Sequence, residues 1–150
     1  MSGAEPPSTV PALLRDVVAA RGAHDAVVVA QETLSYEELD RRTSRMARAL
    51  LAIGAGKGAR IALMAPDGLL WITTFLAGLR IGALMSVVST LCTPPELAHI
   101  LRNSDTQIFI GARRFLRHDY ARTLMAAIPG LAEGRAEALR TPAAPYLRSV

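Results

Sequence analysis

The sequence holds a single cysteine, Cys92, and only three histidines, which are His24, His99 and His118. One cysteine cannot form a disulfide within the chain or supply a cysteine-based metal cluster. The histidines lie far apart and follow no ligand spacing, so the sequence predicts no metal site. We expect Cys92 to be a buried structural residue rather than a nucleophile, because no histidine is placed to activate it.

Lysine is equally scarce, since Lys57 is the only one among 17 Lys and Arg residues. The net charge of +4 and the pI of about 10.0 are compatible with a nucleic-acid partner. The arginines, however, are spread along the chain among acidic residues, and no basic run alternates with aromatic residues. We therefore expect no nucleic-acid partner and assign the arginines of residues 41–48 to a solvated helical face.

A basic and strongly apolar leader is also missing from residues 1–14, which predicts no signal peptide and a cytoplasmic location by default. Residues 68–92 are long enough to cross a bilayer, and a membrane-associated hairpin built on them is one alternative. Arg80 lies near their middle, where insertion costs about 2.5–3.5 kcal/mol. Gly82 divides the run, so we expect a buried helix and a buried parallel strand, with no transmembrane segment.

Aliphatic residues are abundant and fall into alternating helical and strand-like segments. Their spacing predicts helices at 11–21, 35–53, 69–80, 93–103 and within 115–128, and strands at 26–30, 33–35, 61–65, 84–88 and 107–111. Residues 129–145 read as a loop, and 146–150 as the opening of a further strand. This order predicts an α/β fold with a mostly parallel, Rossmann-like or flavodoxin-like sheet that is incomplete at its C-terminal end.

The helix predicted over 35–53 carries several local signals. Ser35 and Glu38 fit a capping box, in which each side chain satisfies a backbone amide of the other residue. Glu37 precedes Arg41 by four residues, and Glu38 precedes Arg42 by four, so both pairs are expected to form ion pairs. The predicted apolar side consists of Leu39, Thr43, Met46, Leu50 and Ile53.

Other helix ends are marked as well. Gly22 is expected to end the first helix in a left-handed conformation. Asp67 is expected to cap the helix over 69–80, and Gly82 to end it. Thr93 and Glu96 form a second capping box.

Residues 54–60, GAGKGAR, look at first like a phosphate-binding loop. Both common phosphate motifs place the glycines after a strand and before a helix, so that the helix amides meet the anion. Here a helix precedes the glycines and a strand follows, and no hydroxyl residue follows Lys57. We therefore interpret Gly54 as a helix stop and Gly56 and Gly58 as a turn into the sheet.

The remaining polar residues form no recognisable catalytic pattern. Ser86, Ser89, Thr90 and Thr93 lie close together without glycine or lysine, and no Gly-x-Ser-x-Gly elbow occurs. His99 and His118 read as polar helix positions. We thus identify no catalytic, cofactor-binding or metal-binding residue, and the substrate-binding residues are unknown.

Taken together, three stretches resemble a known family. TLSYEELDRRTSRMARALLAIGAGKGARIALMAPDG at 33–68, FLAGLRIGALMSVVS at 75–89 and TPPELAHILRNSDTQIFI at 93–110 are similar, in order and spacing, to the N-terminal region of AMP-forming acyl-CoA synthetases. The resemblance to this adenylate-forming superfamily covers roughly residues 11–111. Asp67, Ala59 and the Ser-Thr-Leu of 89–91 depart from its usual pattern.

The resemblance implies a ligase of fatty acid metabolism. A fatty or aryl carboxylate would react with ATP to give an acyl-adenylate, and a thiol such as coenzyme A would then take the acyl group. It also implies that residues 1–150 are a partial N-terminal subdomain of the AMP-binding large domain, with the small C-terminal domain absent. The family's motifs for ATP, Mg²⁺ and catalysis match nothing here, so we expect a truncated chain that binds no cofactor and is inactive alone.

Truncation would leave an open sheet edge at residues 146–150 and an uncovered sheet face, so we expect self-association or aggregation. The sequence also allows a free-standing flavodoxin-like binding module. The acyl substrate, and the choice between coenzyme A and a carrier-protein thiol, are not determined by these residues.

Overall fold

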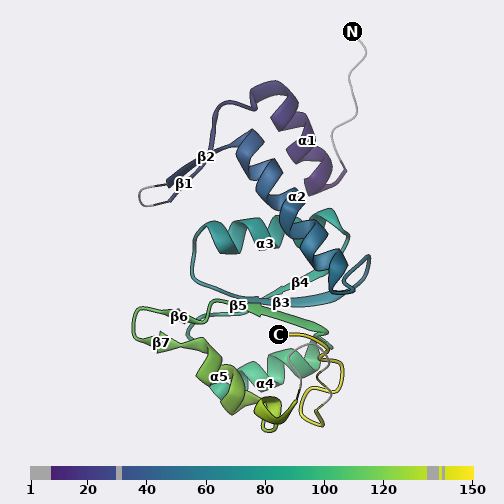
Figure 1. Cartoon of the computed structure of the whole chain (residues 1–150), viewed down its shortest axis with the longest axis vertical. Coiled ribbons are helices and arrows are strands. Elements are labelled where there is room, and N and C mark those ends of the chain that lie inside the picture. Colours follow the sequence, from purple (N-terminus) through teal and green to yellow (C-terminus); the bar gives the residue numbers. More distant parts are fainter. Residues whose placement is uncertain (1–7, 30–31, 135–138, 140) are drawn as a thin grey trace.

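The computed structural model describes residues 8–29, 32–134, 139 and 141–150. Figure 1 shows their arrangement. In chain order the elements are α1 (Val10–Arg21), β1 (Asp25–Val29), β2 (Glu32–Ser35), α2 (Tyr36–Ala52), β3 (Arg60–Met64), α3 (Leu69–Arg80), β4 (Leu84–Val87), α4 (Pro94–Asn103), β5 (Ile108–Gly111), β6 (Arg114–Phe115), β7 (His118–Asp119), α5 (Tyr120–Ala127) and the short 3₁₀ helix η1 (Leu131–Glu133).

The central sheet is parallel and has the order β4-β3-β5. In its register Ile61 lies between Met85 and Ile108. On the outer side of β5, Ser149 forms a parallel bridge with Ile108, and its carbonyl oxygen accepts the Phe109 N–H at 2.9 Å. The predicted further strand is thus a single bridge on β5. The order confirms the α/β fold, and with this bridge it follows the flavodoxin-like pattern.

Helices cover both faces of this sheet, with α2 and α3 on one side and α4 and α5 on the other (Figure 1). Alternate residues of β3 therefore enter different apolar clusters: Ile61 packs with Leu50 and Ala77, whereas Ala62 packs with Leu97. The expectation of an uncovered sheet face is wrong. The prediction of a buried strand over 84–88 is also wrong, because β4 is an edge strand in which Leu84 is 58% and Val87 is 52% exposed.

The predicted start of α2 is confirmed in part. The Ser35 hydroxyl accepts the Glu38 N–H at 3.2 Å. The Glu38 carboxylate pairs with Arg42 at 2.7 Å, as predicted, and also with Arg41, which was expected to pair with Glu37. The Glu38 carboxylate thus forms ion pairs with two arginines that lie one helical turn C-terminal to it.

The predicted apolar side of α2 holds except at its end. Leu39, Thr43 and Leu50 are buried, and Met46 is half-buried against the core. Ala47, which was not predicted, is buried beside them. Ile53 is 55% exposed, because it is the C-cap residue and no longer follows the helical rotation. The chain turns there, and Ala55, only 5% exposed, re-enters the core.

Gly22 does end α1, but not in the left-handed conformation that the sequence predicted. Its φ of −48° and ψ of −42° are right-handed helical values. Glycine is instead favoured by space, because a Cβ atom at this position would lie 2.9 Å from the Val18 carbonyl oxygen. The adjoining β1 and β2 pair antiparallel, and the Ala30 and Gln31 positions of the predicted strand and turn fall outside the described residues.

Two features of the C-terminal third were not predicted. The hairpin of β6 and β7 occupies the beginning of the helix expected within 115–128, and α5 starts only at Tyr120 with Asp119 as its cap. The described part of the 129–145 loop also belongs to the core, since Leu131, Leu139 and Ala144 are buried there.

The long apolar run of residues 68–92 forms α3, a turn at Gly82, β4 and the loop after it. In the described part of the chain, no helix has both the length and the apolar character that crossing a bilayer requires. Arg80, in the last turn of α3, pairs with Asp40 of α2 and lies 3.5 Å from the Thr43 hydroxyl. The charge inside this run is therefore compensated between two helices.

Candidate functional site

The glycine-rich segment 54–60 is a helix terminus and a sheet entry. Gly54 has a φ of +87°, its N–H donates to the Leu51 carbonyl, and the Ala55 N–H donates to the Leu50 carbonyl, both at 3.0 Å. These two bonds form a Schellman motif, which satisfies the carbonyls at the negative end of α2. The Gly58 N–H donates to the Gly82 carbonyl at 2.8 Å. The segment is thus a turn, and its geometry does not suit a phosphate.

The carboxyl end of the parallel sheet carries a hollow of about 480 Å³. The segment after β3, the end of β4 and the hairpin surround it. Its lining includes Pro66, Asp67, Trp71, Val88, Ser89 and Phe115. In open α/β sheets, ligands bind outside the carboxyl ends of the strands, where neighbouring crossovers leave to opposite faces. The chain leaves β3 toward α3 and β5 toward α5, on opposite faces, so this edge is the candidate site (Figure 1).

Asp67 was predicted to cap α3, but it does not. Gly68 is the N-cap residue, and α3 has no side-chain cap. Asp67 is an exposed residue lining the hollow beside Trp71. The Asp67 carboxylate therefore lies at the candidate site. The sequence analysis missed this position because Asp67 matched a helix-capping pattern.

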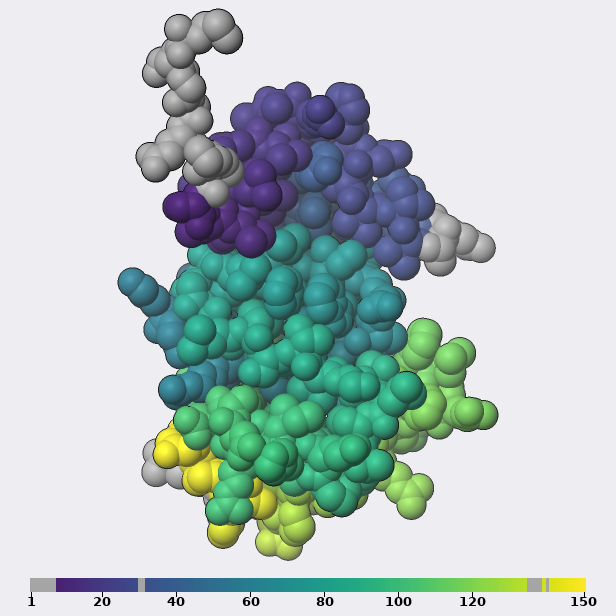
Figure 2. Space-filling model, turned by 180° about the vertical axis from the view of Figure 1, so that it is seen from behind, coloured from purple at the N-terminus to yellow at the C-terminus, as the bar shows by residue number. Residues whose placement is uncertain are grey.

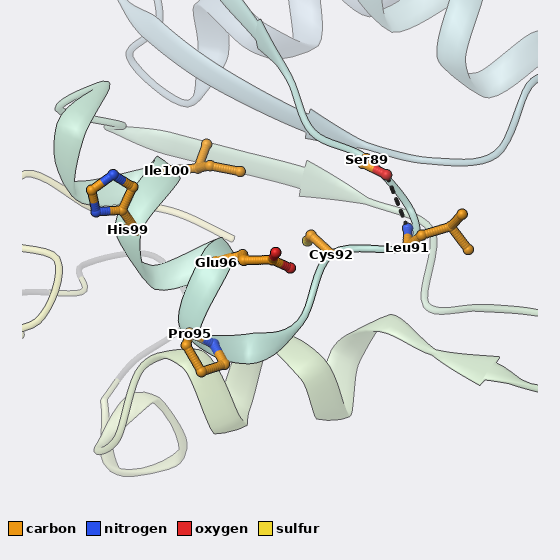
Figure 3. A pocket seen from close by; sticks show the side chains of 7 residues that line it. All are labelled: Ser89, Leu91, Cys92, Pro95, Glu96, His99 and Ile100. Atoms are coloured by element: carbon orange, nitrogen blue, oxygen red, sulfur yellow. Dashed lines mark hydrogen bonds between the residues drawn. The ribbon is translucent and has the colours of Figure 1, made fainter.

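A second hollow of about 600 Å³ lies between the β4–α4 loop and α4. Figure 3 shows Glu96 pointing toward Cys92, with His99 farther along α4. Burial, and then the negative charge of Glu96, raise the pKa of the Cys92 thiol. His99 contacts Asn103, with 2.9 Å between His99 Nε2 and Asn103 Nδ2. A thiol kept protonated, with a carboxylate as its charged neighbour, is a poor nucleophile, as predicted for Cys92. Cys92 is, however, half-buried at this hollow and not buried as the sequence predicted.

The hydroxyl residues near this loop stabilise turns. The Ser89 hydroxyl accepts the Leu91 N–H at 3.2 Å. The Glu96 carboxylate accepts the Thr93 N–H at 2.7 Å and the Thr93 hydroxyl at 2.8 Å, so the predicted capping box is present. The interpretation of His118 as a helix position is wrong, because His118 lies in β7, before α5 begins, and stacks with Tyr120 at a ring-centroid distance of 6.2 Å.

The described residues contain no group of three His, Cys, Asp or Glu side chains that could hold a metal ion by themselves. Neither hollow is lined by a lysine or an arginine that would neutralise a triphosphate. These two hollows are thus partly apolar and offer no guanidinium or ammonium group for the phosphates of ATP.

Comparison with known proteins places this fold. Residues 14–143 match the AMP-binding enzyme family. The putative acyl-CoA synthetase YngI of Bacillus subtilis is 28% identical over 145 residues, which are 95% of this chain and 26% of YngI. The acyl-CoA ligase sidI of Aspergillus fumigatus is 36% identical over 90 residues, 60% of this chain and 15% of that protein.

A benzoate CoA ligase from Burkholderia xenovorans LB400 has a similar solved structure. The TM-score is 0.70 at 26% identity, over 77% of this chain and 23% of that chain. The chain thus spans about a quarter or less of the length of these relatives. Because the family match extends from α1 into the loop after α5, the chain belongs to the AMP-binding enzyme family.

Proposed function

We propose that this chain forms part of the N-terminal subdomain of an AMP-forming acid–thiol ligase. In that reaction a carboxylate attacks the α-phosphate of ATP and displaces pyrophosphate, and a thiol then attacks the acyl-adenylate and releases AMP. The observation that carries the proposal is the family match over residues 14–143. The parallel sheet, open at its carboxyl edge, supports it.

In this proposal the described residues form part of the wall of the active site and do not carry out the chemical steps. Strands β3 and β4 end at the hollow lined by Asp67, Trp71 and Phe115. Neither this hollow nor the one beside α4 presents a lysine or an arginine to the phosphates of ATP. We propose that the donors for both steps lie in the portion of the relatives that this chain does not match.

The substrate class we propose is a fatty or aryl carboxylic acid, with coenzyme A as the acceptor. Relatives named as a hydroxybenzoate CoA ligase of Thauera aromatica and a fatty acid–acyl-carrier-protein ligase of Streptomyces coeruleorubidus support both acid types. The second name keeps a carrier-protein thiol as an alternative acceptor. We further propose a cytoplasmic location and self-association of the chain on its own.

Pyrophosphate release tests this function. The 150-residue chain alone, given ATP, Mg²⁺ and benzoate or octanoate, is expected to release none. A chimera that joins it to the part of YngI beyond the matched region is expected to release pyrophosphate in an acid-dependent manner. A folded chimera that is inactive with every acid, while YngI is active, would contradict the proposal.

Calorimetry addresses the free-standing alternative. A flavodoxin-like binding module would bind ATP or a flavin saturably as the isolated chain. Under the ligase proposal, the isolated chain shows no saturable heat with either ligand. Saturable flavin binding would therefore favour the binding module over the ligase.

A further inference from the structure

The hairpin of β6 and β7 projects from the body of the molecule (Figures 1 and 2). At its turn, Leu116 is 85% exposed, more than any other large apolar residue in the described chain. Its φ of +51° is a left-handed value that a leucine rarely adopts. Phe115 beside it is 45% exposed. An apolar residue held in water and in a costly conformation points to a role outside folding.

Arginines flank this turn. Arg113, Arg114 and Arg117 are exposed, and Arg122 follows on α5. The local acid, Asp119, accepts hydrogen bonds from the Arg114 side chain at 2.9 Å and from the Arg122 N–H at 3.0 Å. The ion pairs between described residues do not include Arg113, Arg117 or Arg122. The turn is therefore strongly basic.

A hollow of about 320 Å³ lies behind the turn. Two of the uncompensated guanidinium groups, those of Arg117 and Arg122, line it together with His118 and Thr123. The Thr123 hydroxyl donates to the Asp119 carbonyl at 3.2 Å, so the two guanidinium groups are the main donors, and such groups bind phosphate oxygens well. The carboxylate of Asp119, which also lines this hollow, is engaged by Arg114 and by the Arg122 amide.

We propose that this hairpin, residues 113–118 with Arg122, is a contact site for an anionic phospholipid surface. Leu116 enters the boundary between headgroups and acyl chains, while Arg113, Arg117 and Arg122 bind lipid phosphates. A lipid surface fits better than a protein partner, because the exposed apolar part is Leu116 with the half-exposed Phe115, ringed by arginines, and not a broad patch. The proposal does not depend on the ligase function.

Vesicle co-sedimentation of the full chain tests the apolar contact. The chain is expected to bind phosphatidylcholine vesicles that contain phosphatidylserine, and to bind pure phosphatidylcholine vesicles far less. Leu116→Asn removes the apolar side chain and suits the left-handed backbone, so the fold is retained. It should weaken binding by roughly tenfold. Leu91→Asn is the matched control, because Leu91 is 78% exposed elsewhere, and it should bind like the original chain.

The charge contribution is tested with Arg113→Gln/Arg117→Gln, which should weaken binding by roughly tenfold or more. Arg45→Gln/Arg48→Gln carries the same charge change on α2 and should have a much smaller effect. Equal binding to both vesicle types would overturn the proposal, as would equal loss in both double variants. Binding of a soluble phosphoserine peptide that Leu116→Asn leaves unchanged, without vesicle binding, would identify a protein partner and also overturn it.

Discussion

Individual polar residues join helices that are far apart in sequence. Arg80 and Asp40 are 25% and 32% exposed as side chains, and their pair joins α3 to α2. Arg80→Met leaves a half-buried carboxylate without its cation, so we expect the free energy of unfolding to fall by about 1–2 kcal/mol. Arg41→Met is the control, since Arg41 is 66% exposed and such pairs contribute little. Urea unfolding measures both, and equal losses would contradict the assignment.

Glu96 predicts a pH dependence at the same scale. Hydrogen bonds from the Thr93 N–H and then from the Thr93 hydroxyl hold the pKa of Glu96 below its ordinary value of 4.5. A carboxylate whose pKa is lower in the folded state stabilises the fold above its ordinary pKa, and this contribution is lost as the pH falls through the folded pKa. Glu96→Gln should therefore lower the thermal midpoint at neutral pH.

The thermal midpoints of the two proteins should converge when the pH falls well below 4.5, because the Glu96 side chain is then uncharged in both states. Thermal unfolding followed by circular dichroism across the acid range measures this convergence. A difference that stays constant down to the lowest pH would show that the charge of Glu96 is not what caps α4.

At the scale of elements, the sequence correctly predicted those helix ends that are set by hydrogen bonds between neighbouring residues. The Ser35 cap, the Thr93–Glu96 box and the stop at Gly54 depend on neighbouring residues, and all three are present. Asp67 failed as a cap because an equally local alternative, Gly68, begins α3. The sequence alone did not show which of Asp67 and Gly68 is the N-cap residue of α3.

Predictions that depend on distant packing fared worse. The buried loop residue Leu139 and the β6–β7 hairpin have no local pattern that distinguishes them from a solvated loop or a helix start. The candidate hollow was missed for the same reason. It joins Asp67, Trp71 and Phe115, which only the sheet topology brings together.

The turn after α2 gives a prediction for an element boundary. Gly54→Ala places a side chain at a φ of +87° and should cost about 1 kcal/mol of unfolding free energy. Gly56→Ala is the matched control, because Gly56 has an ordinary φ and nothing within 4 Å of an added Cβ. That change should be neutral or slightly stabilising. Chemical denaturation of both variants checks this, and an equal cost would mean that the left-handed position is not what ends α2.

For the whole molecule, the sheet is closed on its faces and open at its edge. Among the described strands, β4 pairs only with β3, and Leu84 and Val87 on it are more than half exposed. An edge strand with exposed apolar residues is a template for pairing with another chain. We therefore expect the isolated chain to associate in a concentration-dependent manner, through this edge and not through its helices.

Leu84→Lys tests that expectation, because a charge on an edge strand opposes strand pairing between copies. It should shift the chain toward monomer in sedimentation velocity at a given concentration. Leu51→Lys on α2 is the control, since Leu51 is 52% exposed and lies away from the sheet edge. It should leave association unchanged. If the chain is monomeric at every concentration, the β4 edge does not mediate association. If both lysine substitutions reduce association equally, net charge and not strand pairing explains the effect.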